Sequence, residues 1–227
     1  MPVFQLSDSL LFPPPALAEE DGLLAVGGDL SVPRLLLAYQ HGIFPWYSPG
    51  EPILWWSPNP RLVLFPEEFH LSKRLGRTIR QQVFSTTFDT DFSGVINQCA
   101  NLRLDDGQGT WLDEAMIQAY CELHELGHAH SVECRQEGKL VGGLYGVSLG
   151  AVFFGESMFS LVRDSSKVAL AGLVERLKGW DFELIDCQVG TGHLQRLGAR
   201  EIPGEEFSAR LAQAVAKPSR LGKWSNP

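Results

Sequence analysis

The sequence predicts an α+β protein with a small N-terminal domain at residues 1–60, followed by a mixed-sheet domain at residues 61–227. Proline- and glycine-rich turns such as FPPPAL, VGGD and FPWYSPGEP interrupt the first 60 residues, which is typical of a small domain with little regular structure. From Arg61 onward, helical and strand-like patterns alternate. Three successive strand-like runs joined by short turns precede a helix and one more strand. This order predicts an antiparallel meander followed by a strand parallel to its neighbour.

One helix is clear in the N-terminal domain, within the stretch SVPRLLLAYQHG. Ser31 is a typical N-cap residue, Pro33 suits the first helical turn, and Gly42 suits the position just past the helix end. We expect the rest of this domain, including the aromatic-rich stretch IFPWYSPGEPILWW, to form loops held by proline and aromatic packing.

The elements of the second domain follow from hydrophobic periodicity and from turn signals at their ends. Helical spacing predicts helices at residues 71–82, 92–101, 111–127, 165–180 and 204–216. Apolar runs bounded by turn residues predict strands at residues 61–65, 84–89, 130–136, 139–148, 151–159 and 183–189.

This order of elements is similar to the acetyltransferase-like fold of the GNAT superfamily. In that fold two central strands splay apart, and the ligand enters where they separate. Here those strands would carry Glu156 and Asp186. Glu156 lies in the otherwise apolar run GAVFFGESMFS, where an ionised side chain needs a partner or a task because desolvating an isolated charge is costly.

Composition favours a protein with reduced thiols. Four cysteines (Cys99, Cys121, Cys134 and Cys187) lie far apart without C-x-x-C spacing, which argues against a zinc knuckle or a disulfide framework. The sequence shows no basic-then-apolar signal segment at its start and no apolar run near the roughly 20 residues that span a bilayer. We therefore expect a soluble cytoplasmic protein that acts as a monomer and has no membrane partner.

Charge is unevenly distributed along the chain. The net charge of −8 would by itself disfavour a nucleic-acid partner. The helix at 71–82, however, lies in a stretch without acidic residues and carries Lys73, Arg74, Arg77 and Arg80 opposite an apolar side of Leu71, Leu75 and Ile79. A second stretch without acidic residues follows Glu206 and holds Arg210, Lys217, Arg220 and Lys223. Such local patches suit a phosphate backbone, although a basic helix face taken alone is slightly more often just a solvated surface.

The segment HELGH at residues 124–128 matches the H-E-x-x-H motif of zinc proteases, whose chemistry needs both histidines on one helical face. Gly127 interrupts this pattern where the helix should end, and His128 leads directly into a strand. The two histidines are therefore expected to diverge, and capping or packing is a better interpretation than a metal site.

An acyl-CoA-dependent N-acetyltransferase is the alternative function that the fold suggests. The pyrophosphate signature of that superfamily, Q/R-x-x-G-x-G/A, should follow the fourth strand, but the chain reads LVRDSSKVA there, without glycine. A partial match at residues 195–200 comes too late in the sequence. We expect the fold without the CoA-binding loop, and hence a different acyl donor.

The strand ELIDCQV carries another possible site. Strand alternation places Asp186 and Gln188 on one face, and Glu156 on the neighbouring strand could share that face. Paired acceptors beside an amide suit an amine that is positioned and deprotonated while it attacks a carbonyl. Helix capping or bonding to loop backbone is an equally good interpretation of Asp186 and Gln188.

Four tryptophans, Trp46, Trp55, Trp56 and Trp111, lie on or beside loops. Tryptophan faces stack on nucleobases, and each such contact contributes roughly 1–3 kcal/mol. Packing within the protein is the simpler interpretation for any one of them. A basic helix in the same chain raises the expectation that one or two contact a base.

Several motifs together resemble one family over nearly the whole chain, from about residue 4 onward. They are FPW, WWSPNPR, GTW, HELGHAHS, LVGGLYGV, FFGESMFS, SSK and LIDCQV. By these motifs the chain is similar to the leucyl/phenylalanyl-tRNA–protein transferases, a family of bacterial aminoacyltransferases. The segments GESMFS and IDCQ, in this order, are the most specific part of the match.

The resemblance implies that leucine or phenylalanine, and less often methionine, moves from its tRNA ester to the α-amine of a protein beginning with Arg or Lys, which marks that protein for degradation. The resemblance implies no metal and no nucleotide cofactor. The ester is already activated, so no covalent enzyme intermediate is required. Orientation of amine and ester would supply most of the acceleration. Asp186 would polarise Gln188 or a water molecule, and the sequence does not distinguish these as acceptors of the amine proton. A tRNA-binding module without catalysis is favoured only if Asp186, Gln188 and Glu156 prove dispensable.

The resemblance also implies site residues. Asp186, Gln188 and Glu156 would be the catalytic residues, and Trp46 and Trp111 would contact the 3′-terminal adenosine of the tRNA. An apolar pocket for the donor side chain would be formed by Leu144, Phe153, Gly155, Met158, Leu170, Leu173, Leu177 and Ile185. The tRNA backbone would be held by Lys73, Arg74, Arg77 and Arg80.

One detail conflicts with regular strand geometry. The implied pocket places Phe153, Gly155 and Met158 around one space, which strict alternation forbids. We therefore expect a bulge or twist near Gly155, with Glu156 partly exposed to the site.

Overall fold

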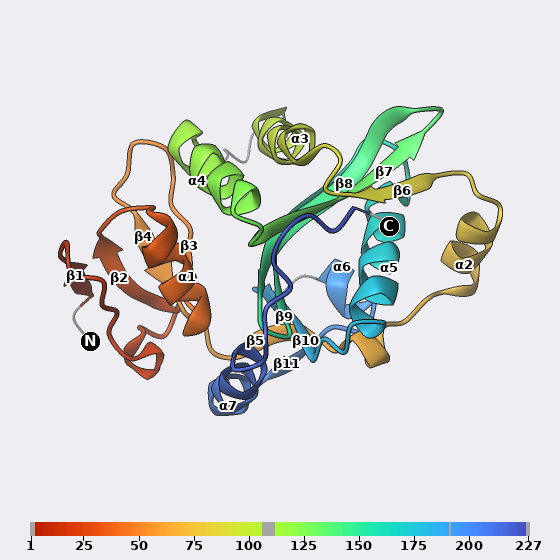
Figure 1. The fold of residues 1–227 in the computed structure, drawn as a ribbon. Helices are drawn as coiled ribbons and strands as arrows, with labels where there is room; N and C mark the ends of the chain where they lie inside the picture. Colours follow the sequence, from red (N-terminus) through yellow and green to blue (C-terminus); the bar gives the residue numbers. More distant parts are fainter. Residues whose placement is uncertain (1–2, 106–111, 191, 226–227) are drawn as a thin grey trace.

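A computed structural model of the chain describes residues 3–105, 112–190 and 192–225. It contains two sheets, a small one within the first 56 residues and a larger one that begins at Arg61 (Figure 1). The small sheet has the strand order β1-β2-β4-β3 and is formed by β1 (Phe4–Leu6), β2 (Leu23–Gly27), β3 (Phe44–Pro45) and β4 (Leu54–Trp56). Only β1 and β2 are parallel. The division of the chain at residue 60 stays a prediction.

The prediction that the N-terminal region consists of loops around one helix is wrong, because it missed this small sheet. Its strands are only 2 to 5 residues long and include Gly27 and Pro45, so no alternation is visible in the sequence. The expected aromatic packing is present: Trp55 is fully buried and donates its indole N–H to the Gly27 carbonyl at 2.9 Å. The predicted helix is also confirmed as α1 (Val32–Gln40).

The larger sheet has the order β11-β5-β10-β9-β8-β7-β6. Its strands are β5 (Arg61–Leu64), β6 (Ser85–Phe88), β7 (Ala129–Gln136), β8 (Lys139–Leu149), β9 (Val152–Ser160), β10 (Leu184–Gln188) and β11 (Arg200–Ile202). Strands β7, β8 and β9 form the predicted antiparallel meander, and β10 pairs parallel to β9 as predicted. All other neighbouring strands are antiparallel.

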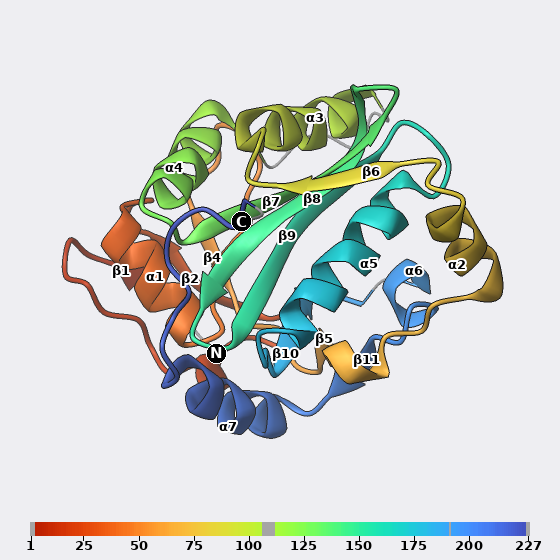
Figure 2. The same cartoon turned by 45° about the vertical axis from the view of Figure 1, so that its right-hand side comes forward.

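Helices cover both faces of this sheet (Figures 1 and 2). The helices are α2 (Lys73–Arg80), α3 (Phe92–Asp105), α4 (Glu114–Glu125), α5 (Ser165–Lys178), α6 (Gly192–Gln195) and α7 (Gly204–Val215), with short 3₁₀ turns η1 (Pro15–Leu17) and η2 (Pro66–Glu68). Successive side chains along the strands point to opposite faces of the sheet and thus contribute to two apolar cores. Tyr145 and Phe154 pack on the side of α3 and α4, whereas Leu144 and Phe153 pack on the side of α5. The expected GNAT-like mixed-sheet domain is therefore confirmed by its strand order.

The two central strands splay apart, as predicted. Pairing between β10 and β9 ends at Asp186 opposite Phe154, although β9 continues to Ser160. Gln188, at the end of β10, has a positive φ of 62°, a conformation uncommon outside glycine. The backbone of β10 thus turns away from β9 and leaves a space between the strands.

Helix α2 differs in part from its prediction. Leu75 is buried, but Leu71 and Ile79 are exposed. The helix lies at the edge of the molecule beyond α5 (Figure 2), and its buried residues are Leu75 and Gly76. Amphipathic spacing identified the helix but overstated how much of it is buried.

Two further elements were not predicted, α6 and β11, because each is only 3 or 4 residues long. After α7, residues 216–225 form no regular element and return across the sheet toward α5 (Figure 1). Among the residues that the structure describes, no helix combines the length and the apolar character needed to cross a membrane.

Candidate active site

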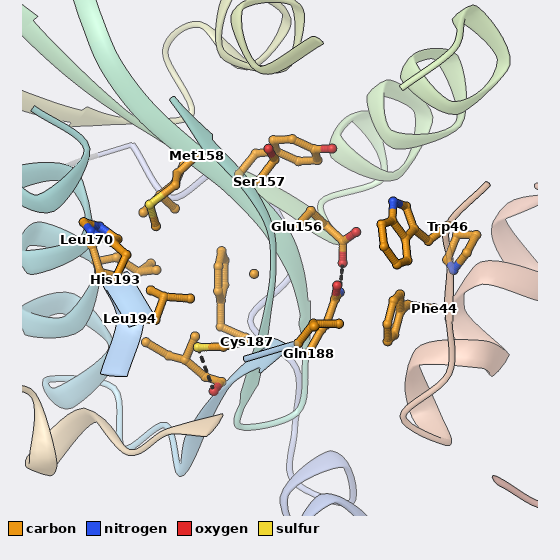
Figure 3. A pocket seen from close by; sticks show the side chains of 18 residues that line it. Phe44, Trp46, Glu156, Ser157, Met158, Leu170, Cys187, Gln188, His193 and Leu194 are labelled. Atoms are coloured by element: carbon orange, nitrogen blue, oxygen red, sulfur yellow. Dashed lines mark hydrogen bonds between the residues drawn. The ribbon is translucent and has the colours of Figure 1, made fainter. Parts of the chain in front are cut away.

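A cavity of about 450 Å³ occupies the space where β9 and β10 separate. Its lining comes from β3, β8, β9, β10, α5 and α6. Figure 3 shows the two ends of this cavity. Met158, Leu170, His193 and Leu194 gather at one end, and Glu156 and Gln188 point toward each other near Trp46 at the other. An apolar compartment thus adjoins a small set of polar groups, which is the usual composition of a ligand site.

The structure brings together seven of the eight residues predicted for the apolar pocket. They are Leu144, Phe153, Gly155, Met158, Leu170, Leu173 and Ile185. Leu177 does not line the cavity and is fully buried in the core beneath α5. It lies four residues beyond Leu173, about 6 Å farther along the helix axis, so its place in the pocket is corrected to a place in the core.

Sequence reasoning missed several lining residues. They are Phe44, Pro45, Tyr145, Ser157, Cys187, Val189, His193 and Leu194. Strand β3 has 2 residues and α6 has 4, too few for either to leave a periodic pattern. The FPW motif was the one signal that pointed to the first of these elements.

The predicted irregularity in β9 is confirmed. Tyr145 of β8 pairs with Ser157, and Gly146 pairs with Gly155, so Glu156 is an extra residue without a partner on β8. Gly146 permits this, because a Cβ atom there would lie 2.1 Å from the Phe154 carbonyl oxygen. The bulge turns Gly155, Glu156 and Met158 toward the same cavity.

Glu156 is held by a hydrogen bond at each carboxylate oxygen. Oε1 accepts from the Gln188 side-chain amide at 2.8 Å, and Oε2 accepts from the Tyr120 hydroxyl at 2.8 Å. The side chain is only 9% exposed. Burial raises the pKa of Glu156 to about 7, although the hydrogen bonds from Tyr120, Tyr39 and Gln188 oppose this. The Glu156 carboxylate therefore faces the cavity from an otherwise apolar strand and accepts a hydrogen bond at each oxygen.

The raised pKa of Glu156 predicts a pH-dependent stability. Between pH 5 and 7 the folded protein binds a proton at Glu156 that the unfolded chain has already lost, so the free energy of unfolding falls as the pH rises through this window. Relative to Glu156→Gln, the wild type should lose on the order of 3 kcal/mol between pH 5 and pH 8. Urea unfolding of both proteins at the two pH values measures the difference. An equal pH dependence in both would contradict the raised pKa.

Tyr39 extends this chain of hydrogen bonds into the N-terminal region. The hydroxyls of Tyr39, on α1, and Tyr120, on α4, lie 2.5 Å apart, and both side chains are fully buried. Burial, together with the nearby Glu156 carboxylate, raises the pKa of both tyrosines, so both remain protonated donors. Neither tyrosine was predicted, because each occupies an ordinary apolar position of its helix.

Asp186 lies behind the cavity and does not line it. Its carboxylate is fully buried and forms a bidentate ion pair with Arg61. The Arg61 Nε donates to Oδ1 at 2.8 Å, and Nη2 donates to Oδ2 at 2.7 Å. The Arg61 guanidinium also lies over the rings of Phe44 and Phe207, 4.9 and 4.7 Å from their centroids. The prediction that Asp186 shares a face with Gln188 is wrong, because the register between β10 and β5 shifts between these two residues.

Gln188 is positioned by both carboxylates. Its backbone N–H donates to Asp186 at 2.9 Å, and its side-chain amide donates to Glu156. Among the residues that the structure describes, no hydrogen bond occupies its amide oxygen, which is therefore available to a ligand in the cavity. Of the three predicted catalytic residues, Gln188 and Glu156 line the site, and Asp186 supports it from behind.

Trp46 lines the cavity and is 44% exposed, so one indole face is accessible to a ligand. Its backbone is fixed, since its N–H donates to the Leu54 carbonyl and its carbonyl accepts from the Trp56 indole. The other predicted adenosine contact, Trp111, lies outside the described residues.

The four predicted tRNA-backbone residues, Lys73, Arg74, Arg77 and Arg80, are all exposed on α2. They do not line the cavity. Arg74 differs from the other three, because it forms an ion pair with Asp164 at 2.8 Å. Asp164 also accepts from Lys167, so the charge of Arg74 is partly neutralised within the protein.

The HELGH segment is used for packing. Helix α4 ends just before Gly127, as predicted, and the φ of Gly127 is +79°. The His124 ring donates to the Ala129 carbonyl at 2.8 Å and stacks on Phe92 at 4.3 Å. His128 follows the helix end, so the two histidines do not share a helical face.

Two family models match this chain. The model described as leucyl/phenylalanyl-tRNA protein transferase matches residues 63–212, and the model for the N-terminal domain of that transferase matches residues 28–59. Relatives named leucyl/phenylalanyl-tRNA–protein transferase cover nearly the whole chain. One from Desulforapulum autotrophicum is 56% identical, covering 99% of this chain and 98% of its own. One from Syntrophobacter fumaroxidans is 57% identical, with coverages of 99% and 96%. One from Azotobacter vinelandii is 58% identical, with coverages of 93% and 94%.

Solved structures with a similar arrangement are much more distant. An aminoglycoside acetyltransferase from an uncultured soil metagenomic sample matches with a TM-score of 0.41 and 12% identity, covering 65% of this chain and 98% of its own. A ribosomal-protein-alanine N-acetyltransferase from Brucella melitensis matches with a TM-score of 0.37 and 12% identity, with coverages of 64% and 96%.

Proposed function

This chain belongs to the leucyl/phenylalanyl-tRNA protein transferase family, and on that premise we propose that it transfers leucine, phenylalanine or methionine from aminoacyl-tRNA to the N-terminal amine of a protein. The observation that carries the proposal is the apolar cavity that ends at the Glu156–Gln188 pair. The apolar compartment suits an unbranched thioether, a branched aliphatic or an aromatic side chain, and it excludes polar ones because their burial without hydrogen bonds is costly.

The reaction replaces an ester bond with a peptide bond. The acceptor amine nitrogen attacks the ester carbonyl carbon, the bond from this carbon to the ribose oxygen breaks, and the proton lost by the amine leaves with that oxygen by way of an intermediate acceptor. The free amide oxygen of Gln188 is placed to accept a hydrogen bond from the amine, while Glu156 fixes the amide orientation. Holding amine and ester in this geometry supplies most of the acceleration, and the activated ester makes a cofactor unnecessary.

Asp186 is proposed as a positioning residue. It is buried against Arg61 and bonds to the backbone N–H of Gln188, so it holds the end of β10 in its irregular conformation. We propose this positioning role in place of direct contact between Asp186 and the amine, because Asp186 is buried behind the cavity and does not line it.

Acceptor proteins are proposed to begin with Arg or Lys and to be marked for degradation by the added residue. The net charge of −8 favours a cationic acceptor over an anionic one. We further propose that the protein works as a monomer in the cytoplasm, where aminoacyl-tRNA is available.

The tRNA end is proposed to contact Trp46 through the 3′-terminal adenine, by stacking on its exposed face. Trp111 is assigned the same role by family motif only. The phosphate backbone of the acceptor stem is proposed to contact Lys73, Arg74, Arg77 and Arg80 of α2.

We predict that the basic residues of α2 contribute unequally to tRNA affinity. Arg77→Ala should lower tRNA affinity and reduce the slope of log Kd against log salt concentration by about 1, as expected for one lost phosphate contact. Arg74→Ala should change the slope by less than half of that, since Asp164 already pairs with Arg74. Binding titrations at several salt concentrations measure both slopes. A larger effect for Arg74 than for Arg77 would contradict this assignment.

Gly155→Val tests the donor pocket. An added Cβ atom would meet only the Asp186 carbonyl, at 3.6 Å, so the backbone tolerates the side chain, which then occupies the cavity. We expect kcat/KM for phenylalanine to fall at least about tenfold, since a methylene-sized change in a pocket is worth that much. Gly172→Ala on α5 is the control, because its methyl group would contact Thr86 and not the cavity. Equal activity of Gly155→Val and the control would contradict the pocket assignment.

One experiment tests the function as a whole. The protein is incubated with tRNA carrying labelled leucine and with a peptide that begins with Arg, with and without ribonuclease. Labelling of the peptide that ribonuclease abolishes is the expected result. Parallel reactions with labelled acetyl-CoA, and with a peptide that begins with Glu, test the donor and acceptor classes. Acetyl transfer without leucyl transfer would overturn the proposal.

A further inference from the structure

Residues 216–225, after α7, are fixed to the larger sheet at several points. The backbone N–H of Gly150 donates to Ser219 at 2.8 Å, and that of Gly222 donates to the Gly127 carbonyl at 3.3 Å. Lys217 forms an ion pair with Glu183 at 2.6 Å. The segment has no regular structure of its own, yet these contacts give it one defined path across the molecule (Figure 1).

The path ends with Trp224 inserted into the core beside α5. The side chain is 4% exposed. Its rings stack on His130 at 3.7 Å and meet Trp180 edge-on at 5.0 Å. Its backbone N–H donates to Asp89 at 2.6 Å, and its carbonyl accepts from Arg176. A large rigid side chain is therefore held at both its ring and its backbone.

Trp224 lies directly behind a residue of the candidate active site. The ring centroids of Trp224 and Phe153 lie 5.9 Å apart, and the two ring planes are inclined by 42°. Phe153 lines the donor cavity, whereas Trp224 does not. On its other side Trp224 lines a separate hollow of about 400 Å³, together with Trp180 and Arg220. Phe153 thus lines one space and Trp224 the other, and their two rings pack against each other.

From this arrangement we propose that Trp224 is a specificity-determining positioning residue of the donor pocket, which keeps Phe153 pressed toward the cavity and thereby sets the depth of the pocket. The inference rests on the proposed function and adds to it a residue 36 positions beyond the end of β10, outside every motif that identified the site. Trp224 touches no reacting atom; its effect passes through the Phe153 ring.

Removal of the indole would leave space behind Phe153, because close-packed side chains relax only in part into a vacated volume. The Phe153 ring would then move back and deepen the pocket. A deeper pocket favours a phenylalanine donor over a leucine donor. We expect Trp224→Ala to raise the ratio of kcat/KM for phenylalanine to that for leucine by about five- to tenfold.

The experiment compares Trp224→Ala and Trp224→Phe with two control variants of the same segment, Arg220→Ala and Lys223→Ala. Transfer from phenylalanyl-tRNA and from leucyl-tRNA to one peptide is measured for each. Trp224→Phe keeps an aromatic ring and should restore a ratio near that of the wild type. The controls should leave the ratio unchanged, because both side chains line the separate hollow and not the donor cavity, and both variants keep the indole.

A double-mutant cycle tests the route through Phe153. In a Phe153→Leu background, Trp224→Ala should produce no further change in the ratio. If circular dichroism shows that Trp224→Ala does not fold, Trp224→Leu replaces it. This variant vacates less volume and should raise the ratio of kcat/KM values by a smaller factor. A parallel loss with both donors, at constant ratio, would overturn the inference while leaving the function intact. Absence of transfer from either donor by the wild type would instead overturn the proposed function.

Discussion

Asp186→Ala is expected to lower the free energy of unfolding by about 3–5 kcal/mol, as is typical when one partner of a buried ion pair is removed. The loss would leave the Arg61 guanidinium uncompensated, and it is buried in a site whose other neighbours are the rings of Phe44 and Phe207. Arg61 and Phe44 belong to different sheets, so the loss should also loosen the contact between the two sheets. Urea unfolding followed by circular dichroism measures the change.

A companion variant separates the two causes of this loss. Replacing both partners, Arg61→Leu with Asp186→Leu, removes the uncompensated charge and should recover much of the stability. Turnover should not recover, because the hydrogen bond from the Gln188 backbone to Asp186 is still missing. Recovery of both stability and turnover in the double variant would contradict a positioning role for Asp186.

Gln188→Ala is expected to reduce kcat by about 10² to 10³ while leaving the affinity for aminoacyl-tRNA unchanged. The side-chain amide is the polar group that Glu156 fixes at the edge of the cavity, and its oxygen is the acceptor proposed for the amine. Single-turnover kinetics and tRNA binding, measured on the same protein, separate the two effects. Val189→Ala is the matched control, since the neighbouring Val189 also lines the cavity but offers no acceptor.

Glu156→Ala should reproduce most of this loss, and the double variant should lose little more than either single variant. This non-additivity is expected when one residue acts through another. Full additivity would instead mean that Glu156 contacts the substrate independently. If Gln188→Ala raised the Kd for tRNA by the same factor by which it lowered kcat, Gln188 would instead be a binding residue.

Much of the fold was predictable because the mixed-sheet domain has long, regular elements. The meander 129–160 and helix α5 follow from periodicity, and the position of β10 follows from the preference for parallel pairing across a helical crossover. The bulge at Glu156 was predictable for another reason. The resemblance implies that Phe153, Gly155 and Met158 surround one pocket, which regular alternation forbids, and an extra residue in the strand resolves that conflict.

Other features depend on contacts between distant residues and leave no local pattern. Arg61 begins an ordinary strand, and nothing near it in the sequence indicates that its partner lies 125 positions away. Tyr39 and Tyr120 occupy apolar helix positions, and only the assembled structure shows that their hydroxyls lead to Glu156. Leu177 continues the stripe of α5, but helix length carries it past the cavity. Periodicity indicates which side of an element is buried, but not against which residue.

The path of residues 216–225 has a consequence for biosynthesis. A ribosome makes the protein from its N-terminus, so β9, α5 and β10 are complete well before Trp224 emerges from the exit tunnel. Until then the side chains of His130 and Phe153 lack their shared neighbour. While Trp224 is still inside the exit tunnel, the nascent chain would therefore lack the residue that we propose to set its choice of donor.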